Sequence, residues 1–149
     1  MSEKESLQIE FPVDADFIPA VRKFVAESSL IEGFTPKFSY RTEIIVDELC
    51  NNAVKYGPST QGASIKISCE FKDDAIQLTV QDPGGNAKDV QNLRKVIGAN
   101  ENNTAFVGHG LEIVRMLTSG MEVSQTTNGE TVIRVVKRRS QNLIDTLTE

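Results

Sequence analysis

One stretch, residues 35–57, limits what this chain can fold into more than any other feature. It opens with Thr35 and Pro36, a helix-capping residue followed by the residue best suited to the first helical position. It closes with Gly57 and Pro58, which commonly end a helix. Between these signals, apolar residues recur at helical spacing: Ile45, Val46, Leu49, Cys50, Ala53 and Val54. The stretch therefore predicts a long helix that packs one side on a core.

The opposite side of this predicted helix carries a line of polar residues at spacings of three and four: Glu48, Asn51, Asn52 and Lys55. A carboxylate, two amides and an ammonium group are compatible with an ordinary solvated helix face. They are equally compatible with a site for a charged ligand. Motifs elsewhere in the sequence are needed to choose between these two interpretations.

Strands and a second helix are predicted on both sides of this stretch. Residues 7–11 alternate apolar and polar, as in a strand, and residues 15–26 follow an Asp14 cap with a helical stripe of Phe17, Ala20, Val21, Phe24 and Val25. Residues 31–34 are then a linker. Two hairpins follow downstream, the second around an Asn-Gly turn, with strands at 63–71 and 75–80, and at 121–126 and 130–136.

The other segments complete an α+β fold. Residues 88–97 predict a short helix, 98–104 a mobile loop and 111–118 a further helix. Strands and helices do not alternate regularly, so we expect a two-layer α/β sandwich with a mixed, mostly antiparallel sheet and helices on one face. We expect a single domain over residues 1–149, with its core at about 7–137 and a tail at 138–149.

The amino-acid composition limits the kinds of molecule that the chain is expected to bind and the cellular compartment in which it is expected to lie. The 16 basic and 21 acidic residues give a net charge of −5, which disfavours direct binding to nucleic acid or to an anionic membrane. We expect no membrane segment, because no apolar run approaches the roughly 20 residues that a spanning helix needs. The N-terminus lacks the apolar region of a signal peptide. Cys50 and Cys69 lie in apolar patterns without metal-ligand spacing, so two buried free thiols in the cytoplasm are expected.

Three short motifs follow one another along the chain, on the long helix, at a strand exit and at a loop-to-helix junction. Each motif is common alone: many helices contain the first, and the glycines of the other two occur in ordinary turns and helix starts. Their order and placement are far more specific. The motif residues are Glu48, Asn52 and Lys55, then Asp82, Gly84 and Gly85, then Gly108 and Gly110.

This set resembles the N, G1 and G2 boxes of the ATPase superfamily shared by gyrase, heat-shock chaperones, sensor histidine kinases and mismatch-repair proteins. Within it, the short chain resembles the anti-sigma-factor serine/threonine kinases over about residues 7–137. The resemblance implies a kinase that uses ATP and Mg²⁺ and phosphorylates a serine of an anti-sigma-antagonist protein. It also implies binding of a sigma factor and a homodimer.

On the long helix, the resemblance assigns Asn52 as the Mg²⁺ ligand and Glu48 as the residue that orients or deprotonates the attacking hydroxyl. An amide oxygen suits Mg²⁺, which prefers oxygen ligands and retains several waters. General-base help of this kind contributes roughly 10²–10⁴ in rate. Lys55 matches a phosphate-contacting lysine, and we expect Asn51 to face solvent.

The other two boxes are assigned to the nucleotide. Asp82 would accept the adenine amino hydrogen, while Gly84 and Gly85 would let the backbone approach the base. Backbone amides freed by Gly108 and Gly110, at the start of the helix that continues with Leu111, would bind phosphate oxygens. His109 lies between these glycines, and we interpret it as a variable loop position in the phosphate site, not as a catalytic histidine.

Two departures from the family pattern bear on catalysis. Asn86 stands where the second glycine of the G1 box is usual, and residues 104–107 contain no basic side chain next to the G2 box. The second departure favours an alternative function, a non-catalytic, adenine-nucleotide-gated protein-binding module. A histidine-kinase catalytic domain is disfavoured, because no helix with a phosphoacceptor histidine precedes the domain and because glutamate heads the N box. A purely structural domain is the remaining alternative.

Overall fold

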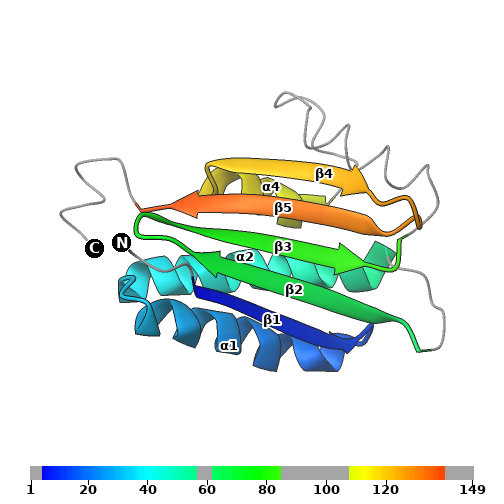
Figure 1. The fold of residues 1–149 in the computed structure, drawn as a ribbon, viewed down its shortest axis with the longest axis horizontal. Helices are drawn as coiled ribbons and strands as arrows, with labels where there is room; N and C mark the ends of the chain where they lie inside the picture. The colour runs from blue at the N-terminus through cyan, green and yellow to red at the C-terminus, as the bar shows by residue number, and fades with distance from the viewer. Residues whose placement is uncertain (1–4, 57–61, 85–107, 140–149) are drawn as a thin grey trace.

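The computed structural model describes residues 5–56, 62–84 and 108–139. Figure 1 shows the arrangement of the elements in space. Along the chain these elements are β1 (Glu5–Pro12), the 3-10 turn η1 (Ala15–Phe17), α1 (Ile18–Ile31), α2 (Pro36–Tyr56), β2 (Ser64–Phe71), β3 (Ala75–Asp82), α4 (Gly108–Leu117), β4 (Gly120–Gln125) and β5 (Thr131–Arg138).

The strands form one five-stranded sheet in the order β1-β2-β3-β5-β4, with the helices on one of its faces (Figure 1). In the helical layer α2 lies between α1 and α4 and contacts both. The α+β class and the two-layer arrangement are therefore confirmed. The sheet was expected to be mixed, but every pairing among the described strands is antiparallel. Both predicted hairpins join neighbouring strands directly, and this connection favours antiparallel pairing.

The core fills the space between the sheet and its helices. Alternate residues of each strand face this layer, because successive side chains of a strand point to opposite faces. The largest fully buried side chains come from both layers: Val25, Phe38, Ile45, Val46, Leu49, Ile65, Ile67, Ile76, Leu78, Leu111, Val114 and Ile133. Cys50 and Cys69 are free and buried as expected, and burial raises the pKa of both thiols to about 12.

α2 matches its prediction closely. The Thr35 hydroxyl caps the helix by accepting a hydrogen bond from the Phe38 amide at 3.1 Å, and Pro36 opens the first turn. The predicted apolar side is buried except for Val54, which is half-buried. The caps and the apolar spacing of this stretch therefore fix both the start of the helix and the side that it turns to the core.

The predicted stripe of α1 is correct at Val21 and Val25, which are buried, and wrong at its other three positions. Phe17, Ala20 and Phe24 are exposed, whereas the buried residues are Ile18, Val21, Val25, Ala26, Ser28 and Ser29. The Asp14 carboxylate does accept a hydrogen bond from the Asp16 amide at 2.9 Å, but the turn that it caps is the 3-10 turn η1. Phe17 belongs to this turn and not to the α-helix, and the buried side of the helix follows Ile18, Val21 and Val25 at spacings of three and four. The helix also continues to Ile31, beyond its predicted end.

Some predicted elements differ little from the observed ones, and others cannot be compared with the structure. α4 begins at Gly108, three residues before the predicted helix, and the β4–β5 hairpin forms around the predicted Asn-Gly turn. The helix expected at 88–97, the loop at 98–104, residues 104–107 and the tail beyond 139 lie outside the described residues, as do Gly85 and Asn86.

Candidate functional site

The three motif-bearing segments lie at the same end of the molecule. Figure 1 shows the C-terminal half of α2, the end of β3 and the start of α4 at the right-hand end of the sheet in this view. Two of the three motifs pack directly on each other, because Gly110 of α4 lies against Glu48 of α2, and α2 also contacts β3. A ligand held between these elements would meet side chains from each of them.

On α2, Glu48 and Asn52 are half-buried, and both Asn51 and Lys55 are exposed. The prediction that Asn51 faces solvent is confirmed. Within the described residues, the Nδ2 atom of Asn52 is a buried side-chain polar atom without a hydrogen-bond partner. Buried polar groups are almost always paired, and a water, a ligand or a residue outside the described ranges can provide the partner of this one. A half-turn of the amide would exchange its nitrogen and oxygen ends.

Glu48 packs directly on the first turn of α4. A Cβ atom added to Gly110 would overlap the Oε2 atom of Glu48 and would lie 3.1 Å from its Cδ atom. The carboxylate of α2 and the glycine of α4 therefore occupy adjoining space, as the N and G2 boxes would require. Leu111, one residue further on, is buried in the core, so only its backbone is available to a ligand. Gly108 and His109 form the start of α4, and only their backbone is described.

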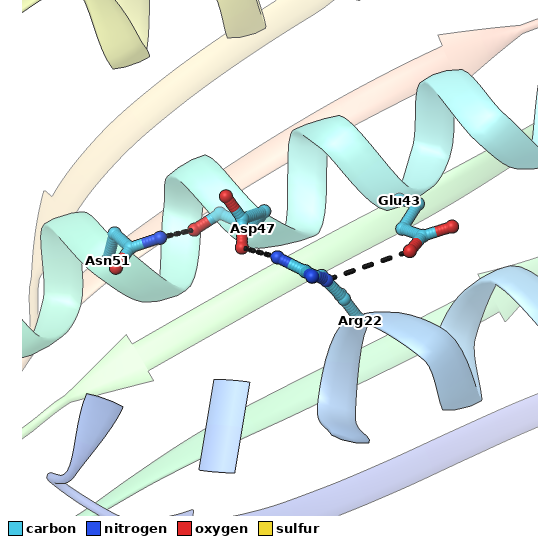
Figure 2. Close-up of polar contacts among 4 residues, drawn as sticks. All are labelled: Arg22, Glu43, Asp47 and Asn51. Carbon is cyan, nitrogen blue, oxygen red and sulfur yellow. Dashed lines mark hydrogen bonds and ion pairs between the residues drawn. The ribbon is translucent and has the colours of Figure 1, made fainter. Parts of the chain in front are cut away.

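The surroundings of Glu48 raise the pKa of its carboxyl group. Burial raises its pKa above the ordinary value, and the neighbouring negative charge of Asp47 raises it further. Arg22 of α1 reduces the free charge of Asp47 by an ion pair at 2.6 Å, and its Nε atom lies 3.6 Å from Glu43 (Figure 2). The Asn51 amide donates to the Asp47 carbonyl at 2.8 Å in the same view. This Arg22 cluster ties α1 to the stretch of α2 that carries Glu48.

Asp82 ends β3 and is only 5% exposed. Its Oδ1 atom accepts a hydrogen bond from the Gly84 amide at 2.7 Å, which turns the chain sharply after the strand. Burial raises the pKa of Asp82 to about 6; the Gly84 hydrogen bond opposes this shift, and the charge of Glu130 adds to it. A buried carboxylate with one partner can still accept hydrogen bonds from a bound amino group.

Gly84 meets two requirements that only glycine satisfies. Its φ is +88°, and an added Cβ atom would overlap the carbonyl oxygen of Gly129 at the tip of the β4–β5 hairpin. The turn after β3 is therefore packed backbone to backbone against this hairpin. Gln81 and Glu130 join the same two segments by a side-chain hydrogen bond.

Gly84→Ala is expected to lower the free energy of unfolding by about 2 to 4 kcal/mol, because it combines an unfavourable φ with overlap against a backbone atom. Gly33→Ala is the matched control, since Gly33 has a φ of +92° but no atom within 4 Å of an added Cβ. Urea unfolding of both variants separates the two causes. Equal losses would show that the contact with Gly129 contributes nothing.

Sequence analysis missed Thr131. This residue is 3% exposed and lies directly opposite Asp82 in the β3–β5 register. Side chains of directly paired residues lie on the same face of a sheet, so Thr131 neighbours the residue that provides the G1 carboxylate. No spacing along the chain signals this neighbour, because the pairing joins residues that are far apart in sequence.

Comparison with known proteins agrees with this geometry. The family described as "Histidine kinase-like ATPase domain" matches residues 11–137 of the chain. The anti-sigma F factor of Pasteuria penetrans is 25% identical over 118 residues, which cover 76% of this chain and 79% of that protein. The anti-sigma F factor of Oceanobacillus iheyensis is 26% identical over 121 residues, with coverages of 79% and 83%.

The fold has a counterpart among solved structures. A chain in the crystal structure of the SiaB-SiaC complex from Pseudomonas aeruginosa superposes with a TM-score of 0.70 at 12% identity, covering 87% of this chain and 88% of that one. At this identity the likeness extends to the fold. No helix in the described part of the chain is long and apolar enough to cross a membrane.

Proposed function

This chain belongs to the histidine kinase-like ATPase domain family, and on that premise we propose that it is an ATP-dependent serine/threonine protein kinase that acts as an anti-sigma regulatory factor. Its substrate is a serine of an anti-sigma-antagonist protein. The observation that carries the proposal is the packing of Glu48 against the start of α4, one helical turn from the unpaired amide of Asn52. The relatives called anti-sigma F factor support the regulatory part.

In this proposal each motif residue has one role in binding. Asp82 accepts a hydrogen bond from the adenine amino group, and backbone amides of Gly108 and Gly110 donate to phosphate oxygens at the positive end of α4. Gly84 and Gly85 keep side chains away from the base. Lys55, exposed on the last turn of α2, supplies a positive charge for a phosphate.

The donor set fits Mg²⁺ bound together with ATP. The oxygen of Asn52 would be the protein ligand, since Mg²⁺ prefers oxygen and is commonly held by one or two protein groups together with phosphates. The structural observation behind this assignment is the place of Asn52, half-buried on the same helix as Glu48, with one end of its amide buried and unpaired; rotating the amide by half a turn would put the oxygen at that end. When bound, the ion neutralises charge on the phosphates, and the remaining work falls to residues of the chain.

Glu48 acts on the attacking hydroxyl. Its carboxylate accepts the proton of the substrate serine, whose oxygen forms a bond to the γ-phosphorus as the bond to the β-phosphate oxygen breaks, leaving ADP. A pKa raised by burial suits this role, because a base is most effective when its pKa approaches the working pH.

The decisive experiment combines the protein with γ-labelled ATP, Mg²⁺ and a candidate antagonist, and locates the label by phosphopeptide mapping. We expect transfer to one serine of the antagonist. ATP binding without transfer would instead support the non-catalytic binding module that the residues before the G2 box favour.

The sigma factor and the homodimer belong to the same proposal. Both require surfaces for other proteins, and α1 with its preceding turn carries the exposed apolar side chains Phe17, Phe24, Leu30 and Ile31. Gel filtration with light scattering, with and without ATP and a sigma factor, tests both assemblies. The mildly acidic chain is proposed to work in the cytoplasm without binding nucleic acid directly.

Asp47→Asn is expected to shift the acidic limb of the kcat/KM profile to lower pH. Glu48 must be ionised to accept a proton, so activity is lost as pH falls through its raised pKa. Removing the charge of Asp47 removes the second cause of that raised pKa. Glu43→Gln is the control, because Glu43 also contacts Arg22 but is not among the causes of the shift. An unchanged limb in Asp47→Asn would remove Asp47 from the electrostatics of the site.

A further inference from the structure

We infer that Gly110 is a positioning residue for Glu48: the missing side chain of this glycine provides the space in which the Glu48 carboxylate lies. This inference rests on the proposed function of Glu48 and deepens it. It gives the second glycine of the Gly-x-Gly motif a role apart from freeing backbone amides for phosphate.

The geometry around residue 110 carries the inference. A Cβ atom there would overlap the Oε2 atom of Glu48, and would lie 3.1 Å from the Cδ atom and 3.8 Å from the Cβ atom of the same side chain. The three nearest heavy atoms thus all belong to Glu48. Among the described residues outside the backbone of α4, no other neighbour lies as close, so Glu48 is the side chain that uses the space left by the glycine.

The backbone of Gly110 does not itself require glycine. The residue lies inside α4, and it is not among the described glycines with positive φ. Glycine is a poor helix former compared with alanine, so its presence in the first turn needs another reason. Close approach of a neighbouring group is such a reason, and here that group is the carboxylate assigned to accept the serine proton.

The two roles of the glycine can be separated, because alanine keeps the backbone N–H. An amide that donates to phosphate is therefore retained in Gly110→Ala, while the carboxylate must move. We expect Gly110→Ala to bind ATP within about threefold of wild type and to lose about 10- to 100-fold in kcat, since small misplacements of a catalytic group are costly. Gly120→Ala is the matched control, because nothing lies within 4 Å of an added Cβ there.

A shorter acid at position 48 tests the mechanism of the loss. Glu48→Asp withdraws the carboxylate by one methylene, so in the wild-type background it should lower kcat. In the Gly110→Ala background the same substitution relieves the overlap and should raise kcat. This reversal of sign is the expected signature of steric coupling between the two positions. Equal losses from Glu48→Asp in both backgrounds would overturn the inference, as would a Gly110→Ala variant that loses ATP affinity but keeps kcat.

Unfolding provides a readout that does not depend on catalysis. Gly110→Ala should lower Tm by a few degrees relative to the same substitution combined with Glu48→Ala, because the clash is absent when the long side chain is removed. A protein that transfers no phosphate would overturn the proposed kinase function but would still show this coupling. Additive Tm changes would overturn the positioning role whatever the activity.

Discussion

Glu48→Gln is expected to lower kcat for phosphotransfer by a factor of about 10² to 10⁴, the usual contribution of a positioned general base. Glutamine has nearly the same shape, so it should keep the packing against Gly110 while losing the ability to accept a proton. ATP affinity should change little, because the proposed contacts to the nucleotide come from other residues. Quench-flow measurement of phosphoserine formation, with a parallel ATP titration, separates the two quantities.

The control for this result is Glu43→Gln, the same chemical change on the same helix at a residue that contacts Arg22. It should retain full activity. A Glu48→Gln variant with wild-type kcat would show that the serine proton leaves by another route. A variant that loses ATP affinity instead would show that Glu48 serves binding.

Asp82→Asn is expected to weaken ATP binding by about 10- to 100-fold, because the adenine amino group loses a hydrogen bond to a charged acceptor. The same substitution should stabilise the nucleotide-free protein. Asp82 is 5% exposed, and burial raises its pKa from 3.8 to about 6, so the folded state disfavours the charged carboxylate. Removing this cost should increase the free energy of unfolding by about 1 to 3 kcal/mol at pH 7.5.

The dependence of this gain on pH has a definite sign. Between the unfolded pKa of 3.8 and the folded pKa of about 6, the folded protein binds more protons through Asp82 than the unfolded chain does. The wild-type protein therefore loses stability as pH rises through this window, and the loss is complete above it. The advantage of Asp82→Asn should be largest at pH 7.5 and should shrink toward pH 5. Paired urea titrations at the two pH values measure it.

Asp16→Asn serves as the matched control for Asp82→Asn. Asp16 is an exposed aspartate in η1, distant in sequence from Asp82. The substitution should not change ATP affinity, and it should not reproduce the stability gain expected of Asp82→Asn, because the Asp16 side chain is exposed. Unchanged ATP affinity in Asp82→Asn would exclude Asp82 from the nucleotide site. A stability gain that does not vary with pH would show that burial of the charge is not its cause.

The features predictable from sequence were those encoded locally. Thr35, Pro36 and the apolar spacing of α2 fixed the central helix, and the Asn-Gly pair fixed the last hairpin, because caps and turns depend on adjacent residues. The buried side of α1 was predicted only in part: Val21 and Val25 are buried, but apolar spacing does not encode the 3-10 turn that contains Phe17. The five-stranded order of the sheet also depends on pairings between distant segments, which periodicity does not specify.

In the candidate site, too, local features could be predicted from sequence and contacts between distant elements could not. Glu48, Asn52 and Asp82 stand in motifs that can be recognised along the chain. The contact between Glu48 and Gly110 and the place of Thr131 opposite Asp82 arise only when distant elements pack. Spacing along the chain therefore predicted which chemical groups belong to the candidate site, and tertiary packing determines which of them lie in contact.

The contact between Gly84 and Gly129 restricts how this chain can vary in length. Surface hairpin turns usually tolerate inserted residues, because their tips touch little else. Here the tip of the β4–β5 hairpin lies against the backbone that follows Asp82. Adding or deleting even one residue at this tip would move the carbonyl of Gly129 and disturb the corner proposed to hold the adenine ring. A short turn that looks dispensable is thus a part of the chain where evolution has little freedom to change the number of residues.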